Sequence, residues 1–347
     1  MKKKYLTILL VTCFTTILSL YFYYKDLVYT ASIDSKMYVV NKLDASLTIY
    51  DLKNASEISC LNLGGEPHEA ITTINQEYII VSEFGKNNKP GNSLHVISTL
   101  SNKVTKEIDL KNNTFPHGLA LTKFKDQILV TSEGTNSLLV VNVKSGEIEK
   151  QISTLQKGTH MVVAHPFEPI AYCANIESGS LSVINYKEGE LIKNIKCGAG
   201  TEGITISLDG REVWVGNVVD NTIDIIDTEK LIIKTTIQEH LGPCRLATTV
   251  DGENIAAVSP QTGSLVLYDT KTKELNNKIQ FPGLSNIIDK LINGTSLPVG
   301  LLFHPEYPFL FVTNSNVDKT AVISTESWEI IGSFPVGDIP DGMALTY

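Results

Sequence analysis

Positive charge is scarce in this sequence. Its 29 Lys and Arg residues are outnumbered by 38 Asp and Glu residues, which gives a net charge of −9 at pH 7. A protein that binds nucleic acid along the phosphate backbone needs a basic surface. The composition therefore argues against nucleic acid as a partner and is compatible with cations and small molecules.

Cysteine is also scarce, with five residues in a chain of 347. An exported protein that relied on disulfides would have more, and a domain of this size does not need them. Cys173 and Cys197 fall within one sequence repeat and could pair, but two buried free thiols are the favoured interpretation. The sequence also lacks a Gly-x-Ser-x-Gly elbow, a P-loop and a Cys-x-x-Cys-His haem motif.

The N-terminus combines basic residues with a long apolar run. Lys2, Lys3 and Lys4 precede residues 5–24, which carry no charge and are enough to cross a bilayer as a helix. Basic residues on this side predict that the start stays in the cytoplasm. We expect residues 1–31 to form an uncleaved signal anchor that holds residues 32–347 outside the cytoplasm, in a periplasm or at the cell surface. A cleaved signal peptide and a secreted protein are the alternative.

A short Gly/Pro-rich turn followed by a small apolar run occurs seven times, at nearly constant spacing. Counted at the third residue of each turn, the steps are 49, 43, 42, 42, 55 and 42 residues. Four strand-like runs within a period of about 40–45 residues are typical of a β-propeller. The third residues are, in chain order, His68, His117, His160, Glu202, Cys244, Val299 and Asp341.

One repeat is regular enough to be divided into its strands. Residues 204–207 form a first strand, and Asp209-Gly210 is a dipeptide that favours a tight hairpin. Residues 212–216 form a second strand, and the alternating residues 222–227 a third. A fourth, outer strand over 231–237 completes the blade.

Several runs resemble the YVTN family of β-propeller repeats, which are WD40-like in layout. The clearest matches are Phe311-Val312-Thr313-Asn314 at a strand end, and residues 223–227 and 181–185 on the next strand. The resemblance covers roughly residues 37–347. It implies a seven-bladed propeller of the kind that lactonase-like proteins also have. It says little about function, because such propellers host several unrelated activities.

The first repeat, over residues 37–51, lacks its opening strand, whereas residues 343–347 look like an opening strand without a blade. We expect the C-terminal run to dock inside the first repeat and close the ring, which removes an exposed sheet edge. The predicted fold is therefore all-β, with seven blades closed by pairing of the N- and C-terminal strands and preceded by the N-terminal membrane helix.

The third residues of the seven turns should form a ring around the propeller axis on one face. His68, His117 and His160 occupy this position in three successive blades, and Glu202 occupies it in the next. We expect these four residues to converge and to bind a ligand there. Imidazoles with a carboxylate suit one transition-metal ion, and zinc, copper, iron and nickel all remain open. The histidines could instead stabilise the turns through hydrogen bonds.

A second repeat position supports the same site. The residue after the second strand is usually Asn, but Glu83 and Glu133 replace it in the blades of His68 and His117. We expect these carboxylates to lie behind the two imidazoles. A carboxylate bonded to the far nitrogen of a histidine is common around metals, and the same pair could transfer protons. Glu83 and Glu133 are therefore the catalytic candidates if the protein is an enzyme.

Two functions remain open. The first is an extracytoplasmic propeller that presents this face to a metal ion, a small molecule or another protein. The second is a metal-dependent enzyme that uses the same residues. The resemblance to lactonase-like propellers implies hydrolysis of a ring ester, and a lyase or an oxidase would need the same groups. Nucleic-acid binding, which some YVTN relatives perform, conflicts with the acidic composition.

Overall fold

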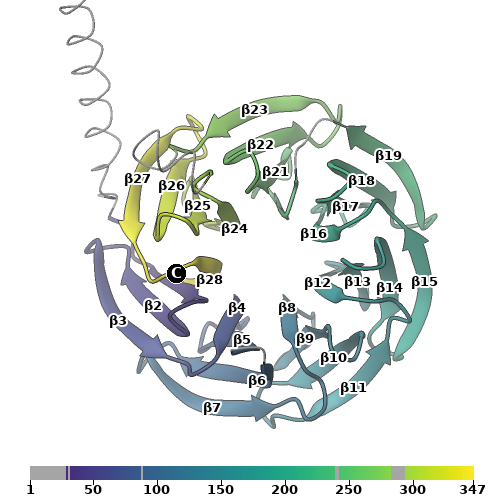
Figure 1. Ribbon diagram of the computed structural model, residues 1–347, viewed down its shortest axis with the longest axis horizontal. Coiled ribbons are helices and arrows are strands. Elements are labelled where there is room, and N and C mark those ends of the chain that lie inside the picture. The colour runs from purple at the N-terminus through teal and green to yellow at the C-terminus, as the bar shows by residue number, and fades with distance from the viewer. Residues whose placement is uncertain (1–28, 30–31, 87–88, 239–241, 283–293) are drawn as a thin grey trace, which may run out of the picture.

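The computed structural model describes residues 29, 32–86, 89–238, 242–282 and 294–347. These residues form seven four-stranded antiparallel sheets arranged as blades around one axis (Figure 1). The expected membrane helix over residues 5–24 lies outside the described residues. Within the described part of the chain, no helix is long and apolar enough to cross a membrane.

Each blade runs from an inner strand at the axis to an outer strand at the rim. We number the blades from the N-terminus. The inner strands are, from blade 1 to blade 7, β28 (Pro340–Thr346), β4 (Glu66–Thr72), β8 (Pro116–Leu121), β12 (Thr159–Ala164), β16 (Thr201–Ile206), β20 (Arg245–Thr248) and β24 (Pro298–Phe303). The second strands are β1 (Lys36–Asn41), β5 (Tyr78–Lys86), β9 (Gln127–Ser132), β13 (Ile170–Asn175), β17 (Glu212–Asn217), β21 (Asn254–Ser259) and β25 (Phe309–Asn314).

The outer half of each blade follows the same order. The third strands are β2 (Ser46–Asp51), β6 (Lys89–Ser98), β10 (Ser137–Asn142), β14 (Ser180–Asn185), β18 (Thr222–Asp227), β22 (Ser264–Asp269) and β26 (Lys319–Ser324). The fourth strands are β3 (Ser56–Asn62), β7 (Lys103–Asp109), β11 (Ile148–Ser153), β15 (Glu190–Lys196), β19 (Ile232–Gln238), β23 (Leu275–Gln280) and β27 (Ile330–Pro335).

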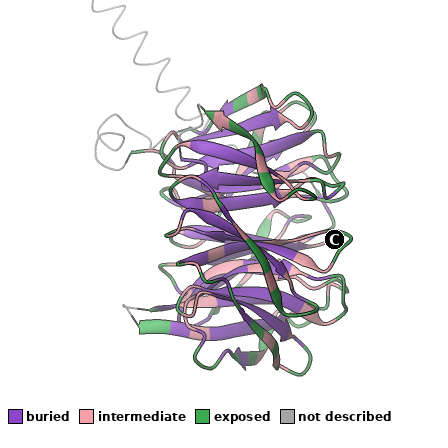
Figure 2. Ribbon diagram, turned by 90° about the vertical axis from the view of Figure 1, so that its right-hand side faces the viewer, coloured by how far each residue is buried: buried purple, intermediate pink, exposed green. Residues whose placement is uncertain are grey.

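The core lies between the blades. The second and third strands are buried on both faces, because each blade packs between two neighbours (Figure 2). They therefore read as continuous apolar runs, as in Ile128–Val130 of β9. Trp214 of β17 is fully buried in the cluster that joins blades 5 and 6. Outer strands such as β7 are mostly exposed and more polar.

The ring closes as the sequence predicted. Strand β28 pairs antiparallel with β1, with Tyr38 opposite Ala344 and Met37 opposite Leu345. Tyr29 adds to this closure, since its backbone N–H donates to the carbonyl of Ser333 at 3.0 Å. The Tyr29 side chain is buried in the cluster that joins blades 7 and 1. Tyr29, near the N-terminus, and β28, at the C-terminus, therefore both contribute to the closure of the ring at blade 1.

The cysteines of the propeller are not cross-linked. Cys60, Cys173, Cys197 and Cys244 are all free thiols. Cys173 and Cys197 are buried in two different clusters of apolar side chains. Burial raises the pKa of both thiols. The interpretation of two buried free thiols is confirmed.

Candidate metal centre at the axial mouth

A left-handed residue turns the chain toward the axis just before most of the inner strands. In six of the seven turns, the residue two positions before the turn's third residue has a positive φ. Glycine adopts this conformation without strain, whereas other residues, and β-branched ones above all, do so at a cost. The six residues are Phe115, Gly158, Gly200, Gly242, Leu297 and Ile339. The turn thus places the following side chains at the mouth of the axis.

Glycine after the third turn residue allows neighbouring inner strands to approach. A Cβ on Gly118 would lie 2.7 Å from the carbonyl oxygen of His160, and one on Gly300 would lie 2.3 Å from that of Asp341. Blades 2, 4 and 6 carry side chains at this position instead of glycine. These are Glu69, Met161 and Arg245.

The three histidines meet, with His117 in the middle. His117 Nε2 lies 2.9 Å from His68 Nδ1. The rings of His117 and His160 lie against each other, with 3.7 Å between their centroids and a tilt of 33° between their planes. Glu202 is farther out, with its carboxylate 3.9 Å from His160 Nε2. The structure therefore brings together the four residues that the sequence placed in one ring.

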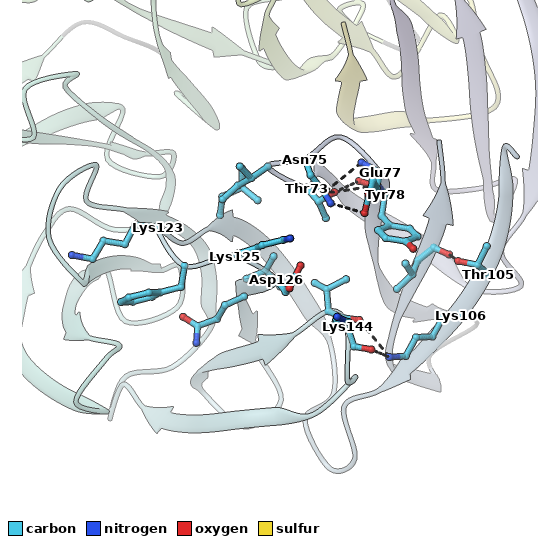
Figure 3. Close-up of a pocket in the computed structure, with 17 residues that line it drawn as sticks. Thr73, Asn75, Glu77, Tyr78, Thr105, Lys106, Lys123, Lys125, Asp126 and Lys144 are labelled. Carbon is cyan, nitrogen blue, oxygen red and sulfur yellow. Dashed lines mark hydrogen bonds between the residues drawn. The ribbon is translucent and has the colours of Figure 1, made fainter. Parts of the chain in front are cut away.

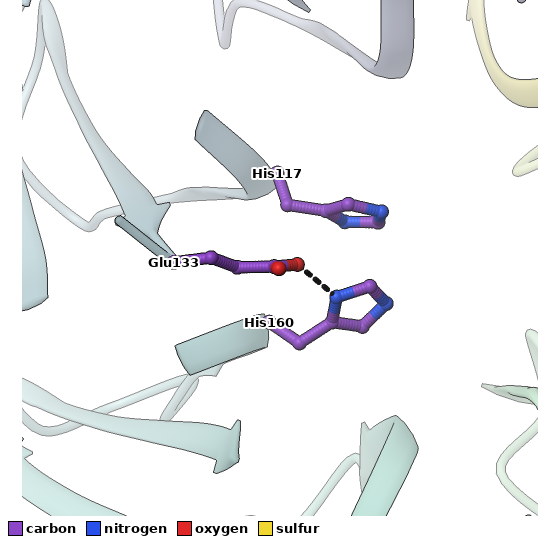
Figure 4. Close-up of side chains that lie close together, drawn as sticks. All are labelled: His117, Glu133 and His160. Atoms are coloured by element: carbon purple, nitrogen blue, oxygen red, sulfur yellow. Dashed lines mark hydrogen bonds and ion pairs between the residues drawn. The ribbon is translucent and has the colours of Figure 1, made fainter. Parts of the chain in front are cut away.

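His117, His160 and Glu133 form the tightest group (Figure 4). Each offers one ligand atom, and these atoms all lie within 4.8 Å of one another. Ligands that share one transition-metal ion lie about 2.0–2.2 Å from it, so about 3–4 Å apart. Small movements of these side chains would therefore allow them to bind a single ion.

One ring nitrogen of His117 is available to bind a ligand. Its Nδ1 is buried and has no hydrogen-bond partner among the described residues. Its other nitrogen is already engaged by His68. An unpaired buried polar atom is unfavourable unless a ligand completes it. This nitrogen is the clearest sign that the group is incomplete without a ligand.

Glu133 contacts a different histidine from the one expected. Its Oε1 lies 2.5 Å from His160 Nδ1, in the next blade, and not behind His117. The strand pairing explains this, because Ser132 lies opposite Pro116 as Asn314 lies opposite Pro298. Ser132 therefore holds the asparagine position of blade 3, and Glu133 is one residue further along. A strand end inferred from apolar pattern alone cannot resolve a one-residue shift.

Glu83 does occupy the asparagine position, but it does not approach His68. It accepts a hydrogen bond from Ser93 Oγ at 2.5 Å, and His95 Nε2 lies 3.7 Å away. In blade 4, the amide of Asn175 bonds the two equivalent third-strand residues. Glu83 thus takes over the structural role of the repeat's asparagine.

Phe84 follows Glu83 and lies against the histidines instead. Its ring centroid is 4.5 Å from that of His68 and 5.7 Å from that of His117. Phe115 packs against Phe84 in turn, with 5.0 Å between ring centroids. The two phenylalanines keep this side of the imidazole cluster apolar.

A charged network crosses the axis beside the histidines, and the sequence interpretation missed it. Arg245 of blade 6 lies 2.7 Å from a carboxylate oxygen of Glu69 in blade 2. The same guanidinium lies 3.4 Å from Asp341 in blade 1 and 3.0 Å from the sulfur of Met161 in blade 4. Lys42 completes the network at 3.2 Å from Asp341. A charged residue in place of the expected glycine was the signal that could have revealed Glu69 and Arg245.

Burial determines the protonation of His68 and His117. It lowers the pKa of His68 to about 3 and lowers the pKa of His117 well below its usual value. Both imidazoles are therefore neutral at physiological pH, which is the form that binds metal ions. No proton has to be displaced from either ring before an ion binds.

The carboxyl groups respond differently. Burial raises the pKa of Glu69 to about 7 and also raises that of Glu202. Burial would raise the pKa of Asp341 too, but Lys42 and Arg245 hold it below its usual value. Two cationic side chains face four carboxyl groups here, counting Glu133. A cation bound nearby would favour the charged form of Glu69 and Glu202.

Two residues of the ring, Cys244 and Val299, do not join the site. Cys244 is buried among apolar side chains of blades 6 and 7, and burial raises the pKa of its thiol. Val299 has no donor atom in its side chain. The candidate site is thus confined to the arc of blades 2 to 5 and its charged neighbours.

Comparison with known proteins supports the fold and goes no further. No protein-family model matches the chain, and no curated protein matches it. One similar solved structure is hydrazine synthase from Kuenenia stuttgartiensis, with 16% identity, a TM-score of 0.68, and coverage of 80% of this chain and 89% of that chain. Another is a functionally unknown protein from Desulfotomaculum acetoxidans DSM 771, with 12% identity, a TM-score of 0.74, and coverage of 90% and 99%. At these identities the likeness shows a shared propeller fold alone.

Proposed function

We propose that this propeller binds one transition-metal ion at its axial mouth through His117, His160 and Glu133. The observation that carries the proposal is the unpaired, buried Nδ1 of His117 within the group of three donors. Two imidazoles and a carboxylate suit zinc, copper, iron or nickel, and not magnesium or calcium, which prefer oxygen ligands.

His68 and Glu202 have supporting roles in this proposal. If His117 binds the ion through Nδ1, its Nε2–H donates to His68 Nδ1 at 2.9 Å. That hydrogen bond selects the tautomer of His117 and fixes the plane of its ring. Glu202 lies beyond His160 at 3.9 Å and is available as a further ligand or as a proton donor.

A metal-dependent enzyme, such as a lactonase-like hydrolase, a lyase or an oxidase, is the second candidate. One observation favours it, namely Glu202, whose carboxyl pKa is raised by burial at the edge of the site. A carboxylic acid that keeps its proton nearer neutral pH can serve as a general acid. A bound metal would supply a Lewis acid, and Glu202 would deliver the proton.

Elemental analysis of the purified chain tests the proposal. After removal of metal with a chelator and reloading, we expect one equivalent of ion per chain. His117→Ala and His160→Ala should each retain less than a tenth of it. His165→Asn, in a hairpin of the opposite face, is the matched control and should bind as the wild type does. Equal loading of all four proteins would contradict the proposal.

We also propose that the propeller lies outside the cytoplasm, anchored through residues 5–24. The lysine run before the apolar segment supports this orientation. Protease added to intact cells should digest the propeller. Complete protection in intact cells, lost only on lysis, would contradict the proposed location.

A further inference from the structure

The face opposite the histidines carries a ring of exposed apolar side chains. In blades 2 to 7 the chain segment between the inner and second strand lies on this face, and in blade 1 the C-terminal residue after β28 does. Every blade exposes one large apolar residue there, each at least 36% exposed. From blade 1 to blade 7 these are Tyr347, Ile74, Phe124, Phe167, Leu208, Val250 and Tyr307. We call them the apolar ring.

The apolar ring distinguishes this face from the histidine face. The outer strands at the rim also expose large apolar residues, namely Ile58, Val104, Ile192, Ile232, Leu275 and Ile331. Around the histidine mouth, the loops of the described residues expose three large apolar side chains, Leu43, Leu155 and Val219. Single exposed apolar residues are normal on a monomer, whereas a set gathered on one face marks an interaction site. One contribution from each blade distributes the apolar side chains around the axis.

A basic cavity of about 630 Å³ opens on this face between blades 2 and 3 (Figure 3). Ile74 and Phe124 of the apolar ring line it, together with two acidic residues, Glu77 and Asp126. Lys125 and Lys144 are exposed, and their ammonium groups form no ion pair or hydrogen bond with any described residue. The lysines that line the cavity are Lys106, Lys123, Lys125 and Lys144.

An acidic cavity of about 650 Å³ opens on the same face between blades 6 and 7. Val250 and Tyr307 of the apolar ring line it, and no lysine or arginine does. The carboxylates of Glu306 and Glu326 are exposed and form no ion pair with any described residue. The acidic residues that line the cavity are Asp251, Glu253, Glu306 and Glu326.

We propose that two copies of this chain associate face to face through the apolar ring. The basic cavity of each copy then lies over the acidic cavity of the other. Both cavities are one and a half blades from the centre of blade 1, on opposite sides. A two-fold axis in the plane of this face, running over blade 1, therefore forms both contacts at once. Such self-complementary contacts are what a closed dimer requires.

The charges of the two cavities favour a second copy of the chain, and not a lipid surface, as the partner of this face. An anionic membrane would attract the lysines of the basic cavity but would repel the acidic cavity on the same face. A second copy places opposite charge over both cavities. Its apolar ring also covers the apolar ring of the first copy. Because each copy carries a net charge of −9, the local attraction must overcome a general repulsion. The apolar contact is therefore necessary as well.

Charge reversal of each cavity tests the proposal. The basic-cavity variant is Lys125→Glu with Lys144→Glu, and the acidic-cavity variant is Glu306→Lys with Glu326→Lys. Sedimentation equilibrium of the full chain, in density-matched detergent, should show a dimer for the wild type. Each variant alone should dimerise at least tenfold more weakly, because like charges then face each other twice. An equimolar mixture should restore the dimer, because both contacts become complementary again.

A second pair of variants tests the apolar contact. Phe167→Ser, in the apolar ring, should weaken the dimer at least tenfold, whereas Leu43→Ser, on the histidine face, should leave it unchanged. A wild-type chain that stays monomeric, or a mixture of charge variants that does not recover the dimer, would overturn the proposal. So would a monomer that binds vesicles of anionic lipid through this face.

Discussion

His117 presents one nitrogen to His68 at 2.9 Å, and its other nitrogen is buried without a hydrogen-bond partner among the described residues. This asymmetry assigns the two histidines different roles, with His117 as the ligand and His68 as the group that orients it. Changing His68 to Asn should therefore weaken metal binding about 10- to 100-fold without abolishing it. Competition with a chromophoric chelator measures the affinity. A complete loss, equal to that of His117→Ala, would instead make His68 a ligand.

Glu133 and Glu83 should have different functions, one in metal binding and the other in stability. Glu133→Gln should lower metal affinity at least tenfold, because the carboxylate beside His160 Nδ1 is lost. Glu83→Gln should leave metal stoichiometry unchanged, since Glu83 bonds Ser93 away from the histidines. It should lower the free energy of unfolding by about 1 kcal/mol. Metal analysis and urea unfolding of both variants check this, and a metal defect in Glu83→Gln would contradict the structural role.

Removing Arg245 should destabilise the propeller strongly. Arg245→Ala leaves Glu69 and Asp341 buried without their common partner. Breaking a buried ion pair on one side costs about 3–5 kcal/mol. The double variant Arg245→Met with Glu69→Gln should recover part of that loss, because it removes one of the two buried charges. Urea unfolding measures both, and a single variant as stable as the wild type would show that the network is not a stabilising one.

Closure by β28 should be needed for solubility. Without residues 343–347, β1 loses the partner that pairs Met37 with Leu345. An unpaired strand edge promotes association with other chains. Light scattering at 37 °C should show aggregation of the truncated chain. A Met343→Leu variant of the full chain, which keeps the strand, should remain soluble.

His304 should make the fold sensitive to mild acid. The side chain is fully buried, its Nδ1 accepts two backbone N–H groups at 3.1 Å, and its Nε2 lies 3.0 Å from Ser35 Oγ. Burial lowers the pKa of His304 to about 4. The unfolded chain, with a histidine pKa of about 6.5, binds the proton first as the pH falls. The contribution of His304 to the free energy of unfolding is therefore fully present above about pH 6.5. It falls by about 3 kcal/mol as the pH is lowered to 4.

His304→Asn keeps an acceptor for the turn but cannot titrate in this range. The free energy of unfolding of this variant should therefore change less between pH 6.5 and pH 4 than that of the wild type. His165→Asn, in the equivalent hairpin of blade 4, is the comparison. An unchanged pH profile in His304→Asn would show that another group causes the acid sensitivity.

The fold was readable from the sequence because its signals repeat. Seven turns at near-constant spacing, together with an unpaired strand pattern at each end, were enough for the blade number and the closure. The grouping of His68, His117 and His160 followed from the same repeat, since equivalent residues of neighbouring blades are close at the axis. Each of these conclusions depends on periodicity and not on any single side chain.

The sequence could not provide the exact strand register at Glu133 or the side-chain contacts that cross the axis. Glu133 was assigned one residue out of position, and its partner became His160 instead of His117. Arg245 reaches across the axis to Glu69, a contact between blades 6 and 2 that no local pattern indicates. Both errors concern side-chain direction near the axis, where several blades converge and a small shift changes the partner.

A crystal structure of the chain soaked with a transition metal tests the central claim most directly. Anomalous diffraction at the absorption edge of that metal should show one strong peak within about 2.0–2.2 Å of His117 Nδ1, of His160 and of Glu133. No peak at the axial mouth, or a peak held only by surface residues elsewhere, would contradict the account.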